Sequence, residues 1–174
     1  MRASKKITVS AALIAMGTVL LTLGGIFGVL ELSCGAVASL LVVFACIEIG
    51  SPYSYLVWLG TSLLCAIFFP ASTVWGTYLL AFGLYPIVKG LIERSKRPFW
   101  LPLKLVFAVF ATVALMMLER LVFGVPLFDV EFAWLRYILY VCMVFALFLY
   151  DYFLTVMIRV YFLRYRKLFL RLLK

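Results

Sequence analysis

The stretch FGLYPIVKGLIERSKRPFW, residues 82–100, decides the fold, because an apolar segment ends there in a cluster of cations. A membrane-spanning helix that leaves the bilayer on the cytoplasmic side is typically followed by lysine and arginine. The stretch therefore raises the expectation of a membrane protein, and the rest of the chain supports it. The cluster consists of Arg94, Lys96 and Arg97.

Composition places the whole chain in the membrane class. Hydrophobic residues make up 67% of the 174 residues and charged residues 13%, and the mean hydropathy is +1.19. A soluble domain carries about twice that charged fraction, roughly 25%. No linker-like tract interrupts the apolar runs, so residues 1–174 are expected to form one integral membrane domain. The apolar run after MRASKK is longer than a signal-peptide core, so it is expected to remain as the first span.

Apolar runs and turn signals together predict six spans. A helix needs about 20 apolar residues to cross the hydrocarbon core, and Pro, Gly and Ser clusters separate runs of about that length. The prediction is an all-α, polytopic membrane helix bundle with six transmembrane helices. The second and third runs are short, so they could instead form a hairpin that does not cross fully. The predicted spans are 8–30, 34–50, 53–70, 73–93, 104–123 and 137–160.

Loop cations predict the orientation. The positive-inside rule places loops rich in lysine and arginine in the cytoplasm, and six spans with both termini cytoplasmic in the cell membrane satisfy every loop. The same placement explains the net charge of +9 as topology and contact with anionic lipids, so nucleic acid is not an expected partner. The cytoplasmic cations would be Arg2, Lys5, Lys6, Arg94, Lys96, Arg97, Lys104, Arg164, Arg166, Lys167, Arg171 and Lys174.

Two residues of the opening stretch are unusual inside a span. Pro86 lacks an N–H and is expected to kink the fourth helix. Lys89 could extend its long side chain to the lipid phosphates. Alternatively it could pair with Glu48 or with Asp151, and Asp151 is the better candidate because it lies deeper in its span. Lys89 and Asp151 are therefore a predicted intramembrane charge pair.

Small residues follow one face of the first predicted span. Such faces let helix backbones approach closely in lipid, either inside one bundle or against a partner protein. Ala11 and Ala15 lie nearest the cytoplasmic end and are the predicted partner-docking positions. The face comprises Ala11, Ala15, Thr18, Thr22 and Gly25.

Residues for enzyme chemistry are scarce. The chain has no histidine, which excludes imidazole general bases, Ser/His/Asp triads and H-E-x-x-H zinc sites. Its four cysteines are scattered without a C-x-x-C pair and are interpreted as small apolar residues of the core. We expect no enzymatic activity, no cofactor and no metal site.

Six spans, cytoplasmic termini and the A-x-x-x-A element in SAALIAMG together resemble the S component, the substrate-binding membrane subunit of energy-coupling factor transporters. The resemblance implies that Ala11 and Ala15 dock on a transmembrane coupling subunit, which carries an ATPase pair. It also implies that a small metabolite binds near the outer face. Three features depart from the family: the loop VLELSCG is short, vitamin-specific signatures are absent, and the lack of histidine argues against the nickel and cobalt members.

A second resemblance leads to a different class of function. The rod-shape-determining membrane proteins of the cell-wall elongation machinery are similar in size and number of spans. A protein of that kind would act as a scaffold and would need no ligand pocket. A cavity with converging polar groups in the outer half would favour the binding protein.

The predicted ligand contacts lie on the outer side of the fifth and sixth spans. Carboxylates outnumber arginines there and aromatic residues accompany them, a combination that favours a small cationic or zwitterionic metabolite. Glu119, Asp129 and Trp134 are the predicted contacts. Arg136 is expected to receive a carboxylate of the ligand.

Overall fold

The computed structural model describes residues 3–28, 30–124 and 133–166, and helix is the only regular secondary structure in these residues. The predicted all-α class is confirmed for this part of the chain. The α-helices are α1 (Ala3–Phe27), α2 (Glu31–Phe44), α3 (Tyr53–Phe68), α4 (Val74–Thr77), α5 (Tyr85–Ile92), α6 (Trp100–Leu118) and α7 (Ala133–Val160). The short helical segments are η1 (Ala45–Ile49), η2 (Tyr78–Phe82), η3 (Arg97–Phe99), η4 (Glu119–Phe123) and η5 (Tyr161–Tyr165), of which η3 is a 3₁₀-helix and the others are π-helices.

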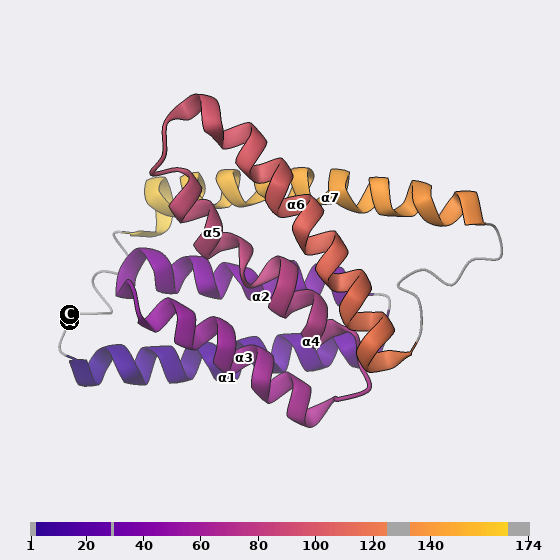
Figure 1. Ribbon diagram of the computed structural model, residues 1–174. Helices are drawn as coiled ribbons and strands as arrows, with labels where there is room; N and C mark the ends of the chain where they lie inside the picture. The colour runs from indigo at the N-terminus through magenta and orange to yellow at the C-terminus, as the bar shows by residue number, and fades with distance from the viewer. Residues whose placement is uncertain (1–2, 29, 125–132, 167–174) are drawn as a thin grey trace.

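The chain runs back and forth along the bundle, and α4, η2 and α5 together make one pass (Figure 1). The start of α1, the α5–α6 connection and η5 lie at one end, which we call the basic end. The far end holds the α1–α2 and α3–α4 connections, η4 and the start of α7. The described loop and terminal cations gather at the basic end: Lys5, Lys6, Arg94, Lys96, Arg97, Arg164 and Arg166.

Five helical passes in the described residues are long and apolar enough to cross a membrane, which makes the protein a membrane helix bundle. The predicted third span differs. It forms α3, which has 16 residues and at 1.5 Å per residue measures about 24 Å, less than the roughly 30 Å of a hydrocarbon core. The long passes are Ala3–Phe27, Glu31–Ile49, Val74–Ile92, Arg97–Val122 and Trp134–Arg164.

Glycine brings α1 close to its neighbours. A Cβ atom on Gly24 would lie 2.7 Å from Cβ of Cys34 in α2, and one on Gly17 would lie 2.9 Å from Cγ2 of Thr61 in α3. Real Cβ atoms do not approach other heavy atoms this closely, so side chains here would push the helices apart. Without a hydrophobic driving force between helices in lipid, such close packing supplies much of the attraction.

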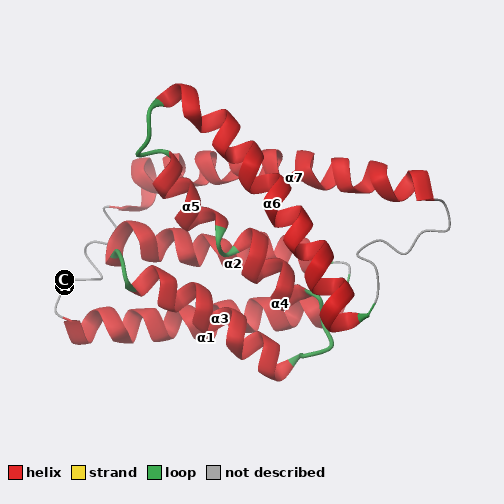
Figure 2. Cartoon of the chain, viewed as in Figure 1, coloured by secondary structure: helices red, strands yellow, loops and turns green. Residues whose placement is uncertain are grey.

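The helical hydrogen bonding of the fourth pass is interrupted just before Pro86. Figure 2 shows a short turn between η2 and α5 at Gly83 and Leu84, although the backbone dihedral angles of both residues stay in the α-helical region. Pro86 lies in the first turn of α5, a position where a missing N–H is tolerated. The N–H of Gly83 bonds to the carbonyl of Tyr78 five residues earlier, at 2.7 Å. This π-type bond shifts the pairing and leaves the carbonyl of Leu79 without its usual partner at Gly83.

Neighbouring helices supply donors to two carbonyls at this break. The indole N–H of Trp58 in α3 donates to the carbonyl of Leu79 at 3.0 Å. The hydroxyl of Tyr150 in α7 donates to the carbonyl of Phe82 at 3.0 Å. Phe82 lies four residues before Pro86, so Tyr150 replaces the N–H that proline lacks. In lipid, where water cannot solvate the backbone, such replacement is what makes a broken helix tolerable.

We expect Tyr150→Phe to lower the free energy of unfolding in detergent by about 1–3 kcal/mol, the usual cost of an unsatisfied buried acceptor. Because Pro86→Ala would restore an N–H facing Phe82, the loss should be smaller in that background. Denaturant unfolding of the four variants measures both effects. Tyr152→Phe is the control, since Tyr152 is exposed on the same helix. Equal losses with and without proline would contradict the assigned role of Tyr150.

Candidate functional site

A charge network lies inside the bundle toward the basic end, and Lys89 of α5 is its centre. Only 2% of the Lys89 side chain is exposed, so it does not extend to the lipid surface. Its ammonium group contacts a carboxylate oxygen of Asp151 in α7 and lies 2.7 Å from Oγ1 of Thr155 and 3.2 Å from Oε1 of Glu93. The structure thus brings together the two residues of the predicted charge pair and adds partners on two elements.

Lys104 of α6 completes the charge network, which consists of Lys89, Glu93, Lys104 and Asp151. Nζ of Lys104 lies 2.6 Å from the second carboxylate oxygen of Asp151, and the hydroxyl of Tyr85 interacts with the same carboxylate. Two formal positive and two negative charges cancel. Each ion is held by an opposite charge, so the group can remain ionised in an apolar surrounding. Its members tie α5, α6 and α7 together.

Glu48, the alternative partner of Lys89, belongs to a separate contact. Its Oε1 accepts a hydrogen bond from the Tyr161 hydroxyl at 3.0 Å and lies 3.5 Å from Nε of Arg166. These bonds fasten η5 to η1 at the basic end. Glu48 therefore holds the end of the last helix to the second pass.

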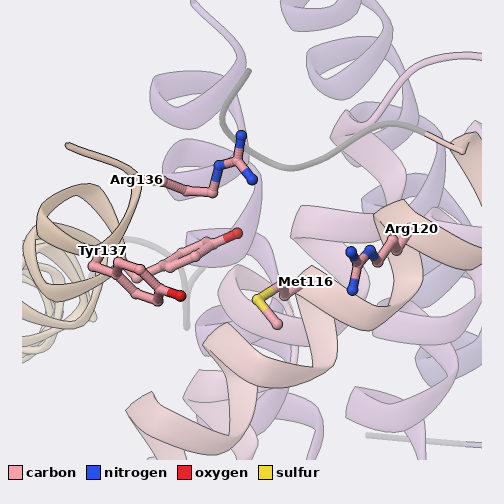
Figure 3. Close-up of a pocket in the computed structure, with 5 residues that line it drawn as sticks. Met116, Arg120, Arg136 and Tyr137 are labelled. Carbon is pink, nitrogen blue, oxygen red and sulfur yellow. The ribbon is translucent and has the colours of Figure 1, made fainter. Parts of the chain in front are cut away.

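A cavity of about 170 Å³ opens at the far end of the bundle between α6–η4 and α7. We call it the arginine–tyrosine cavity. Figure 3 shows Arg136 and Tyr137 on one side, with Met116 and Arg120 across from them. Helical spacing explains the convergence, because Met116 and Arg120 lie one turn apart on their helix, as do Arg136 and Tyr140 on α7. Its described lining is Met116, Arg120, Arg136, Tyr137 and Tyr140.

The cavity contains one of the four predicted ligand contacts. Arg136 lines it. Trp134 does not belong to the described lining and is 63% exposed, since two residues along a helix turn a side chain by about 200°. Asp129 lies outside the described residues, and Glu119 begins η4 with a side chain that is not described. Arg120, Met116 and Tyr140 were not among the predicted contacts, although the one-turn spacing of Met116 to Arg120 and of Arg136 to Tyr140 was a usable signal.

The small-residue face of α1 is divided between two environments. Ala11 and Ala15 are exposed on the outside of the bundle, whereas Thr18 is buried and Gly25 lies against Ser72. The five small residues lie on one face of the helix, but this face is partly inside the bundle and partly outside it. The buried arc of α1 is centred on Gly17 and Gly24, and the predicted face lies along its edge. Ala11 and Ala15 remain open to a partner.

Comparison of the chain with protein-family models, with curated proteins and with solved structures found no match.

Proposed function

We propose that the protein is the substrate-binding membrane subunit of an importer of the energy-coupling factor type. The observation that carries the proposal is the arginine–tyrosine cavity, where polar side chains from two helices converge at the far end of the bundle. A membrane scaffold has no need of such a cavity, whereas a binding protein depends on one. The ligand would be a small metabolite.

The exposed position of Ala11 and Ala15 supports the same proposal. A partner helix can approach the α1 backbone closely there, because neither side chain extends beyond a methyl group. The proposed partners are a transmembrane coupling subunit and its ATPase pair. Docking on α1 would leave the arginine–tyrosine cavity free, because that cavity is formed by α6, η4 and α7.

Copurification tests the proposal directly. The tagged full chain, extracted from its own membrane in mild detergent, should bring down one apolar membrane subunit and two ATPase subunits in a fixed ratio. Loss of these proteins from the purified complex, with cell-wall synthesis enzymes recovered in their place, would overturn it.

The scaffold resemblance has one structural observation in its favour. The first half of α7 presents a row of large apolar side chains to the outside of the bundle. A scaffold could use that row to hold membrane partners. The row consists of Trp134, Tyr137, Ile138, Val141 and Phe145.

For orientation, we propose that the basic end faces the cytoplasm, which follows from the loop cations. Single cysteines introduced near Lys96 and Lys167 in a cysteine-free background should react only after the membrane is made permeable. A cysteine near Asp129 should react from outside in intact cells. External labelling at position 96 would reverse the orientation and remove the cavity from the outer face.

A further inference from the structure

The arginine–tyrosine cavity presents hydrogen-bond donors from two sides. Arg120 comes from η4 and Arg136 from the second turn of α7, and Figure 3 shows their guanidinium groups on opposite sides of the lining. Tyr137 and Tyr140 add two phenol groups. Guanidinium groups only donate, in a planar fork that fits the paired oxygens of a carboxylate or phosphate. Met116 supplies the apolar floor between the two arginines.

We infer that this cavity binds the carboxylate or phosphate group of its ligand, held between Arg120 and Arg136. The inference rests on the proposed function and names the class of substrate for the same site. The expectation from the loop residues was a cationic or zwitterionic metabolite; the inference differs from its purely cationic form, because both described charged groups in the lining are cations. Arg136 keeps its expected role, which is to bind a carboxylate of the ligand. Arg120 is a second residue that would bind the same group.

The volume limits what enters. Pockets for drug-sized ligands measure about 300–1,000 Å³, so a cavity of about 170 Å³ accommodates an anionic group and a few adjoining atoms. Larger parts of a ligand would extend out of the cavity toward the exposed side chain of Tyr137. Small carboxylates and phosphate esters therefore fit better than large aromatic anions.

Thermal unfolding of the purified full chain in a neutral detergent tests the inference. Inorganic phosphate and acetate are the anionic probes, and choline and putrescine are the cationic ones, all at constant ionic strength. We expect saturable stabilisation by an anion and at least a tenfold weaker apparent affinity in Arg136→Gln and Arg120→Gln. Arg97→Gln is the matched control, since it removes an exposed arginine at the basic end. Stabilisation by cations only, or equal responses in all three variants, would overturn the inference.

Two further arms identify the source of the anion and separate this inference from the proposed function. In nanodiscs of phosphatidylcholine, a soluble anion should still bind to the protein. If anionic phosphatidylglycerol displaces this anion, and if the displacement is lost in Arg136→Gln, the phosphate group of the lipid occupies the cavity. The inference that the cavity binds an anion then stands. If the ATPase pair copurifies but no anion binds, the inference fails and the function stands. Anion binding by a chain that recruits no ATPase leaves the inference standing and removes the function.

If the Arg136→Gln protein fails to fold, the Arg120→Gln protein still tests the inference. Arg120 is exposed in η4, so its substitution leaves the packed part of the bundle intact. A folded Arg120→Gln protein with unchanged anion affinity would show that the two arginines do not share one ligand.

Discussion

Replacing Asp151 with asparagine should destabilise the protein more than removing Asp151 and Lys89 together. The single change leaves two lysines facing each other without their shared carboxylate, and breaking a buried ion pair in this way typically costs about 3–5 kcal/mol. Replacing Asp151 with leucine and Lys89 with methionine removes a buried lysine that would keep only Glu93 as its charged partner, and it fills the space with apolar atoms. The lost stability should then be partly recovered.

A double-mutant cycle measures the coupling. Denaturant unfolding of the wild type, Lys89→Met, Asp151→Leu and the double variant should give a non-additive free energy of at least about 1 kcal/mol, within the range seen for contacting residues. Lys96→Met is the control, because Lys96 is exposed in the α5–α6 connection. Additive losses would mean that the two side chains act independently.

A second cycle with Lys104 shows whether Asp151 serves both cations. Lys104 lies nearer the surface of the bundle, with 14% of its side chain exposed, so water can solvate it in part. Its coupling to Asp151 should therefore be weaker than that of Lys89. The reverse order would make Lys104 the principal partner of the carboxylate.

The sequence was informative wherever one physical rule dominated. Apolar length and loop cations predicted the passes and the gathering of basic residues at one end, because burial in lipid leaves little freedom in either. The ends of the helices were less predictable. α6 begins at Trp100 instead of 104, since Pro102 fits within the first turn of a helix and does not prevent it from starting there.

Features that depend on contacts between distant residues escaped prediction. The π-type bond at Gly83 is one case, because the hydrogen bonds of Trp58 and Tyr150 come from helices far away in the chain. Lys104 is another, since it was counted as a cytoplasmic cation at the start of the predicted span 104–123, and its contact with Asp151 was not predicted. Periodicity gives the face of a helix but not the neighbour that it meets.

The cavity illustrates the same limit for the candidate site. Loop composition suggested a cationic or zwitterionic ligand, because carboxylates are numerous on the outer side. Charge counts, however, do not state which side chains converge. Arg120 and Arg136 are 16 residues apart in the sequence, and they line one cavity because α7 runs back along the bundle in the direction opposite to α6 (Figure 1).

The largest effect on function is expected from Ala11→Leu combined with Ala15→Leu, which should abolish recovery of the coupling subunit and ATPase pair. Two leucine side chains would hold a partner helix away from the α1 backbone. The isolated protein should unfold at an unchanged denaturant concentration, because both positions are exposed and face no helix of the bundle. Copurification and unfolding of the same preparation give both readouts.

The matched control is Cys142→Leu with Ala146→Leu. These are also two small, exposed residues one turn apart, on α7 instead of α1, and they add a comparable apolar volume to the surface. Complex recovery should survive this change, since the proposed docking surface is on α1. If the control pair abolishes recovery and the α1 pair does not, the coupling subunit docks on the apolar row of α7, and the docking role of Ala11 and Ala15 is wrong.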